Sequence, residues 1–307
     1  TTEIYTLTLH DALPIWGDAE LQAYLQRVAG YCLTGSTQEH ALFFLYGTGS
    51  NGKSVFVNTL FTLLGDYAAN APMETFMETR TERHPTDLAG LRGSRLVTAT
   101  ETEQGRRWNE AKIKEITGGD RVTARFMRQD YFTYSPQFKL VISGNHKPSI
   151  RNVDEAMKRR MHLVPFTVTI PAERRDRQLQ TKLLTERDGI LAWALQGCLL
   201  WQRDGLQPPE SVQKATAEYF EAEDAIGRWI EERCVLDANA KSLTAELFND
   251  WKQWADASGE FIGSQRRFSD LLLSKGLEKW RNSVGIRGYQ GVGLKEIPKQ
   301  RYPYADD

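Results

Sequence analysis

The run from Gly47 to Ser54, which reads Gly-Thr-Gly-Ser-Asn-Gly-Lys-Ser, holds the residues with the most clearly defined chemistry. It satisfies the pattern G-x-x-x-x-G-K-S/T and lies between an apolar, strand-like run at 41–46 and a helix-like run at 55–64. Glycines let backbone N–H groups curl around a phosphate, and the N-terminus of the following helix adds its dipole. Lys53 is expected to reach the β- and γ-phosphates, and Ser54 to ligate Mg²⁺. The sequence therefore predicts binding of ATP and Mg²⁺, with ATP held by Gly47, Thr48, Gly49, Ser50, Asn51, Gly52, Lys53, Ser54 and Val55.

Two glutamates, Glu101 and Glu103, follow a second buried strand that the sequence predicts at 95–100. A carboxylate just beyond a buried strand can hold Mg²⁺, and a second one can polarise the attacking water. Because residues two apart on a strand share a face, both side chains could point the same way if the extended conformation continues. Two solvated glutamates at a strand end are the alternative.

Asn145 and an arginine pair come next along the chain. Asn145 follows a third predicted strand, 139–143, where an amide could contact both the γ-phosphate and the attacking water. A turn asparagine in Gly-Asn-His-Lys-Pro explains this residue equally well. Arg159 and Arg160 could neutralise the charge on the γ-phosphoryl group of a neighbouring subunit, and a solvated basic face is the alternative.

A predicted hairpin lies between the glutamates and Asn145, with strand-like runs at 121–126 and 131–134 around a turn-prone segment. Its basic residues can bind a nucleic-acid backbone while the neighbouring aromatic residues stack or pack. The predicted DNA-binding residues are Arg121, Arg125, Arg128 and Gln129, of which the last two lie at the expected tip. An ordinary hairpin with exposed arginines and buried aromatics is the alternative.

These residues need an α/β scaffold, which the alternation of strands with helices predicts for residues 16–205. The expected helices cover 16–32, 55–64, 111–117 and 179–202. After a break at 205–209, helical runs at 215–232, 244–257 and 264–275 and a glycine-rich hairpin predict a winged-helix C-terminal domain, 215–301. Residues 264–301 contain nine Lys or Arg and three Asp or Glu, a pattern that suits DNA binding, although a winged helix can equally dock a protein.

Composition limits the class of protein. The chain has 307 residues, 40% hydrophobic and 26% charged, with a net charge of −1, so any nucleic-acid surface must be local. Three cysteines without a Cys-x-x-Cys pair argue against a disulfide framework or a zinc site and predict a reducing, cytoplasmic location. No apolar run approaches the ~20 residues of a membrane span. Residues 1–15 resemble a translated sequencing adapter, so we expect a non-native leader and a missing native N-terminal part.

Residues 16 to about 205 resemble the superfamily 3 helicase domain of phage and plasmid primase-helicases, close to the poxvirus-type primase-helicase. Five segments carry the resemblance, in the order of the family's Walker A, Walker B, B-prime, sensor 1 and arginine-finger motifs: 44–54, 96–103, 117–120, 139–148 and 158–160. It implies an AAA+-like P-loop NTPase core that forms a homo-hexameric ring and moves 3′ to 5′ on single-stranded DNA, with the hairpin in the ring's channel.

The resemblance also implies roles for single residues: Glu101 for magnesium, Glu103 as a candidate catalytic base, Asn145 as sensor and Arg160 as the likelier finger. The family often has two adjacent acids in Walker B, whereas Thr102 separates them here. That departure leaves the division of roles between Glu101 and Glu103 open.

Three functional hypotheses follow from these patterns. The first is an ATP-dependent helicase acting on single-stranded or forked DNA in phage, prophage or plasmid replication, as the C-terminal part of a primase-helicase. The second is a DNA-stimulated ATPase that loads or remodels replication proteins without unwinding. The third, a small-molecule or nucleoside kinase, would need neither a trans arginine nor a basic hairpin.

Overall fold

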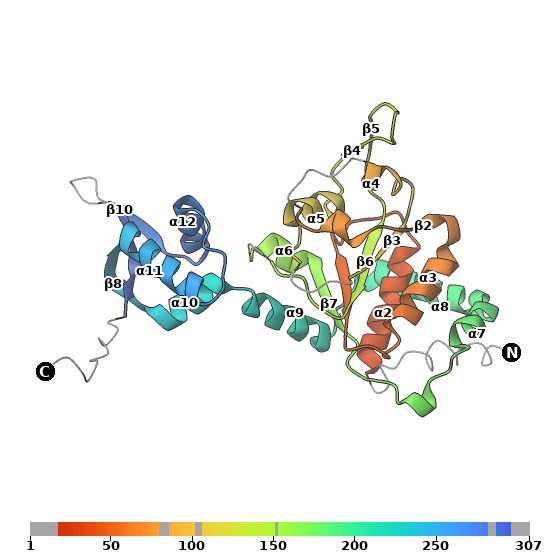
Figure 1. Ribbon diagram of the computed structural model, residues 1–307. Helices are drawn as coiled ribbons and strands as arrows, with labels where there is room; N and C mark the ends of the chain where they lie inside the picture. Colours follow the sequence, from red (N-terminus) through yellow and green to blue (C-terminus); the bar gives the residue numbers. More distant parts are fainter. Residues whose placement is uncertain (1–17, 80–85, 102–105, 151–152, 282–286, 296–307) are drawn as a thin grey trace, which may run out of the picture. The chain divides into compact units, whose positions relative to one another are not determined.

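The computed structural model describes residues 18–79, 86–101, 106–150, 153–281 and 287–295, which form two compact units that divide after Phe220 (Figure 1). The expected leader, 1–15, lies outside these ranges. The division falls later than the predicted boundary at 205–215, because helix α9 (Glu210–Ala222) buries Ala215, Tyr219 and Phe220 in the core of the first unit.

The first unit is built on a five-stranded parallel sheet with the order β2-β3-β6-β1-β7. Three of these strands were predicted from continuous apolar runs, which are typical of parallel strands buried on both faces. The short β2 and the edge strand β7 were not predicted. The strands are β1 (Leu42–Tyr46), β2 (Ala68–Asn70), β3 (Leu96–Thr100), β6 (Lys139–Gly144) and β7 (Met161–Pro165).

Helices cover both faces of this sheet and form a three-layer α/β/α structure (Figure 1). Successive residues of β1 point to opposite faces: Phe43 packs with α2, α3 and α8, whereas Phe44 packs with α5, α6 and α9. The predicted single helix at 179–202 is instead two helices that divide at Glu186. The helices are α2 (Ala19–Cys32), α3 (Lys53–Leu64), α4 (Thr86–Ala89), α5 (Glu110–Thr117), α6 (Glu155–Arg160), α7 (Leu179–Thr185) and α8 (Arg187–Asp204), with 3₁₀ turns at Gly65–Tyr67, Met73–Phe76 and Ala172–Arg174.

The predicted hairpin is present as an antiparallel pair, β4 (Val122–Ala124) and β5 (Phe132–Tyr134). It extends away from the sheet and its helices (Figure 1). Val122 and Ala124 are buried in the core cluster that also contains the apolar side chains of α5. The base of the hairpin is therefore fixed to the body of the unit while its tip is exposed.

The second unit has the order helix, strand, helix, helix, strand, strand, with a three-stranded antiparallel sheet in the order β8-β10-β9. Its core is aromatic, with Trp229, Trp251 and Phe268 in edge and stacked contacts. The predicted helix at 215–232 is interrupted, because Asp224 caps the N-terminus of a new helix by accepting from the Gly227 N–H at 3.0 Å. The elements are α10 (Ala225–Arg233), β8 (Cys234–Leu243), α11 (Thr244–Ala257), α12 (Gln265–Ser274), β9 (Glu278–Arg281) and β10 (Arg287–Leu294).

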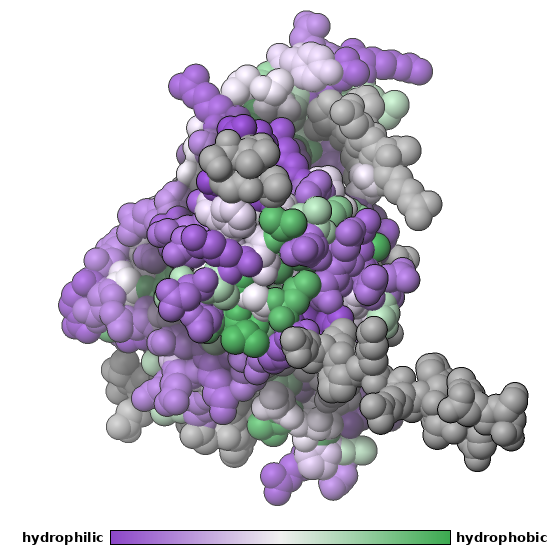
Figure 2. Space-filling view, turned by 90° about the vertical axis from the view of Figure 1, so that its left-hand side faces the viewer, coloured by the Kyte–Doolittle hydropathy of each residue, from purple (hydrophilic) through white to green (hydrophobic). Residues whose placement is uncertain are grey.

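The surface seen in Figure 2 is mostly polar, in contrast to this apolar core. It has one small group of apolar side chains near its centre. Across the described ranges, no helix is both long and apolar enough to cross a membrane. All three cysteines are free thiols, and Cys32 and Cys234 are buried.

Candidate functional site

The Gly47–Gly52 loop joins the carboxyl end of β1 to the N-terminus of α3. Gly52 is the N-cap of α3 and has a φ of 83°, a left-handed conformation that favours glycine. Gly47 is required by close approach, since a Cβ there would lie 2.1 Å from the Phe166 carbonyl oxygen. The first N–H groups of α3 lack partners within the helix and face this loop, so the loop can bind a phosphate.

Lys53 is buried beneath the loop, and its ammonium contacts only neutral oxygens in the described residues. Its Nζ donates to the Gly47 carbonyl at 2.7 Å, to Asn51 Oδ1 at 3.1 Å and to Asn145 Oδ1 at 3.3 Å. Burial lowers the pKa of Lys53 from its ordinary value. A buried cation held by uncharged groups gains from an incoming anion, so this geometry favours phosphate binding.

The segment that follows β7 is distant from the loop in sequence but contacts and supports it. Asn51 Nδ2 donates to the Phe166 carbonyl at 2.7 Å, and the Ile170 N–H donates to the Ser50 carbonyl at 2.8 Å. Sequence reasoning missed this brace, because nothing local marks the segment after β7 as part of the site.

Glu101 lies directly after β3 and is buried, with 6% of its surface exposed. Its Oε2 accepts from the His146 N–H at 3.3 Å, while Oε1 is buried and has no hydrogen-bond partner in the described part of the chain. An unpartnered buried carboxylate oxygen is costly unless something binds it. A divalent cation with oxygen ligands, such as Mg²⁺, fits this position.

A pocket of about 350 Å³ brings the predicted groups together. Lys53, Ser54, Glu101 and Asn145 line it with the other residues from Gly49 to Val55. Thr100, Ser143 and Gly144 also line it, and only their places at strand ends could have indicated them from the sequence. Glu103 lies outside the described residues, so its predicted role stays a prediction.

The arginine pair is not in this pocket. Arg159 and Arg160 end α6 just before β7, and the register pairs Met161 with Leu42, the first residue of β1. The phosphate-binding loop instead follows Tyr46, at the other end of the same strand. The two sites therefore lie beyond opposite ends of the strands, separated by at least the length of β1, which is about 13 Å for four steps of roughly 3.3 Å.

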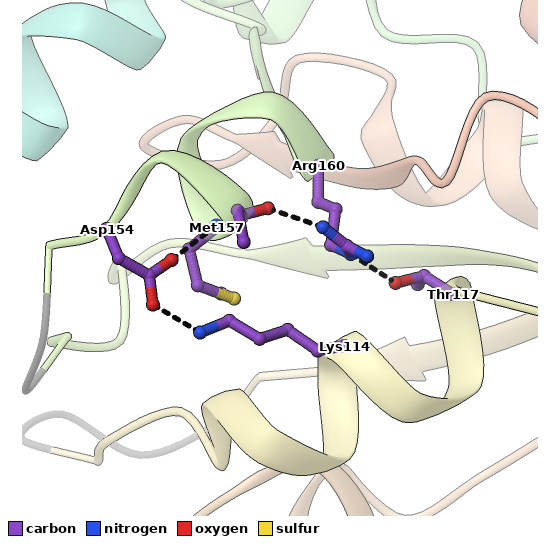
Figure 3. A network of polar contacts seen from close by, with 6 residues as sticks. Lys114, Thr117, Asp154, Met157 and Arg160 are labelled. Carbon is purple, nitrogen blue, oxygen red and sulfur yellow. Dashed lines mark hydrogen bonds and ion pairs between the residues drawn. The ribbon is translucent and has the colours of Figure 1, made fainter. Parts of the chain in front are cut away.

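The two arginines differ in their surroundings. Arg160 is half-buried, and its guanidinium donates to Thr117 Oγ1 at 3.2 Å and to the Ala156 carbonyl at 2.8 Å (Figure 3). Arg159 is exposed.

The predicted DNA-binding residues are distributed unevenly over the hairpin. Arg121, Arg128 and Gln129 are exposed, and Arg128 has a φ of 60° at the turn. Arg125 is instead half-buried, with its guanidinium 4.6 Å from the centre of the Tyr131 ring. Met127 and Tyr131 expose 69% and 58% of their surface, so the tip offers both basic and apolar contacts.

Comparisons with known proteins found a matching family model and several similar proteins. Residues 45–160 match a family described as "Family of unknown function (DUF5906)". Among curated proteins, the chain is 26% identical over 258 residues to "Putative helicase L207/L206" of Acanthamoeba polyphaga mimivirus, covering 77% of this chain and 27% of that protein. It is 26% identical over 305 residues to "Putative helicase 022R" of Frog virus 3, covering 91% and 31%. It is 21% identical to "Putative primase C962R" of African swine fever virus, covering 92% and 31%.

Among solved structures, the apo C-terminal region of NrS-1 superposes with a TM-score of 0.54 at 12% identity, covering 92% of this chain and 74% of that one. The fold and site thus define a P-loop-like α/β protein. More particularly, the chain is similar to viral proteins named as helicases and primases. It spans about a quarter to a third of the length of the curated relatives that it matches.

Proposed function

We propose that the chain is the ATP-driven motor of a superfamily 3 DNA helicase that serves replication of a viral or mobile genome. The observation that carries the proposal is the convergence of Lys53, Glu101 and Asn145 on one pocket beside a phosphate-binding loop. The exposed basic hairpin and the viral relatives named as helicases and primases support DNA as the partner.

Each residue of the pocket has a task in this proposal. Lys53 and the loop N–H groups bind the β- and γ-phosphates of ATP. The Ser54 hydroxyl and the Glu101 carboxylate hold Mg²⁺, which neutralises phosphate charge when bound. Asn145, already hydrogen-bonded to Lys53, reports whether the γ-phosphate is present. Glu103 remains the candidate base for the attacking water.

The arginine pair completes the site from a neighbouring subunit. Arg159 and Arg160 lie at the amino ends of the strands, whereas the loop follows their carboxyl ends. They therefore cannot reach their own chain's pocket without a large rearrangement. A homo-hexameric ring would bring one of them to the next subunit's γ-phosphate, where an arginine stabilises the transition state. Hydrolysis would then require assembly.

DNA contact is assigned to the hairpin tip, with Arg128 and Gln129 gripping one strand during 3′ to 5′ movement. The second unit has the element order of a winged helix, and we propose that it is one, docking either DNA or protein. The full-length protein would be a primase-helicase, in keeping with the relatives that carry either name.

The decisive experiment is unwinding of forked DNA by the wild type, Lys53→Ala and Arg128→Gly. Glycine suits the left-handed backbone of residue 128, so this change removes the side chain without adding strain. Gln207→Gly is the matched control, because Gln207 is exposed, lies outside the hairpin and also has a left-handed backbone, with a φ of 49°. Lys53→Ala should abolish hydrolysis, whereas Arg128→Gly should lose unwinding and keep basal hydrolysis.

The wild type decides between the proposals. DNA-stimulated hydrolysis without unwinding by an assembled ring would favour a remodelling or loading ATPase instead. A rate of hydrolysis that DNA does not change would rule out both the helicase and the remodelling ATPase. Light scattering after size exclusion, with and without ATP and DNA, measures the assembly.

A further inference from the structure

Helices α5 and α6 are joined at two points along their length (Figure 3). At one, Lys114 forms an ion pair with Asp154, which also caps α6 by accepting from the Met157 N–H at 2.8 Å. At the other, Arg160 donates to Thr117 Oγ1. Met157 lies between the two points and is fully buried. The two helices therefore form one packed body that ends in the arginine pair.

The Thr117 hydroxyl is fixed in its orientation. It donates to the Ile113 carbonyl at 2.6 Å, which leaves its oxygen to accept from Arg160 Nε at 3.2 Å. Thr117 exposes 4% of its surface, and Arg160 has no carboxylate partner in the described residues. The position of the guanidinium thus depends on the end of α5.

The same end of α5 leads directly into the hairpin. Gly118 caps the helix, Gly119 turns the chain with a φ of 81°, and β4 begins at Val122. Val122 lies in one apolar cluster with Ile113 of α5 and Met157 of α6. Because protein interiors are close-packed, a force on the hairpin is transmitted to this body rather than absorbed.

We propose that Thr117 and the Lys114–Asp154 pair are positioning residues that couple DNA on the hairpin to the arginine pair. DNA bound at the tip would shift α5, and with it α6 and Arg160, relative to the ATP site of the neighbouring subunit. This inference rests on the proposed function, and it assigns DNA stimulation of hydrolysis to a particular connection within the unit.

The test compares ATP hydrolysis by the whole chain with and without a single-stranded oligonucleotide. Thr117→Val keeps the shape and removes the hydroxyl, and Thr117→Ser restores it. Lys114→Met removes the ion pair between α5 and α6. Lys112→Met is its matched control, since Lys112 pairs with Glu115 on α5 itself at similar side-chain exposure, 29% against 30% for Lys114.

We expect Thr117→Val to lower the DNA stimulation of kcat by about threefold to tenfold, the range for the loss of one hydrogen bond of ordinary strength. The KM for ATP and the affinity for the oligonucleotide should stay within about twofold of the wild type, because neither site is touched. Lys114→Met should lower the stimulation in the same direction, while Thr117→Ser and Lys112→Met should retain it.

Two results would overturn the inference while leaving the helicase proposal intact. One is wild-type stimulation in both Thr117→Val and Lys114→Met. The other is a rate of ATP hydrolysis that falls equally with and without DNA in these two variants, which indicates a structural defect. If Thr117→Val does not fold, Lys114→Met against Lys112→Met decides alone. A wild type that DNA does not stimulate removes the inference and the proposed function together.

Discussion

Gly144→Ala should damage the pocket through a contact that lies beneath it. A Cβ at residue 144 would lie 2.8 Å from Phe44 Cζ and 2.9 Å from Glu101 Cβ. Both separations are shorter than carbon atoms tolerate, and Phe44 is fully buried in the core. Glu101 must therefore move, or the strands β3, β6 and β1 must spread.

The stability loss follows from this overpacking. An extra methyl group in a packed core costs about 1–3 kcal/mol, of which the lower chain entropy of alanine offsets about 0.4–1 kcal/mol. For a unit of this size, 1 kcal/mol corresponds to roughly 2–4 °C in Tm, so we expect the Tm to fall by up to about 10 °C. Gly90→Ala is the matched control, because no atom lies within 4 Å of its added Cβ and its backbone is not left-handed.

The functional loss should be specific to the metal. Displacing a carboxylate from its supported position typically weakens a metal site about tenfold or more, so hydrolysis by Gly144→Ala should need about tenfold more Mg²⁺ for half-saturation. Calorimetry gives the Tm, and a Mg²⁺ titration of ATPase activity gives the half-saturating concentration. If Gly144→Ala matches Gly90→Ala in both measurements, the placement of Glu101 against β6 is not what sets the metal site.

Two further predictions concern the arginine pair and a buried histidine. Arg160→Ala should bind ATP without turnover, and mixing it with Lys53→Ala subunits should restore some hydrolysis at hybrid interfaces; rescue with Arg159→Ala instead would identify the exposed arginine as the finger. Burial lowers the pKa of His162 to about 4, below an unfolded value of about 6.5, so the unfolded state binds the extra proton and stability falls as the pH drops between these values, by up to about 3 kcal/mol. His162→Gln should flatten this part of the Tm–pH curve, and an unchanged slope would exclude His162 as its source.

Local patterns predicted much of the first unit and its pocket. The apolar runs at β1, β3 and β6 were recognisable because strands buried on both faces have no polar positions. β2 has three residues, only half-buried or exposed, and β7 contains a histidine and a proline, so neither shows that pattern. β8 was missed because Asp237 to Ser242 is largely hydrophilic, although it pairs with β10.

Contacts between distant residues could not be read in this way. Asn51 and Phe166 are 115 positions apart, and Thr117 and Arg160 are 43 apart. No periodicity or spacing rule connects such pairs, because the chain between them sets their distance only after the sheet has formed. Gly144 is a similar case. Phe44 and Glu101 leave no room for a Cβ at this position, whereas its own backbone conformation does not require glycine.

The arginine pair shows why this matters for mechanism. The resemblance favoured Arg160, but the structure holds that guanidinium against Thr117 and Ala156 and leaves Arg159 exposed. If Arg160 is the finger, its guanidinium must exchange two hydrogen bonds to neutral oxygens for a contact with the charged oxygens of phosphate. If Arg159 is the finger, Arg160 serves only to fix the end of α6. In both cases the γ-phosphate that the arginine contacts would belong to a neighbouring chain. The register of β7 against β1 puts either arginine at the end of the strands opposite its own phosphate-binding loop.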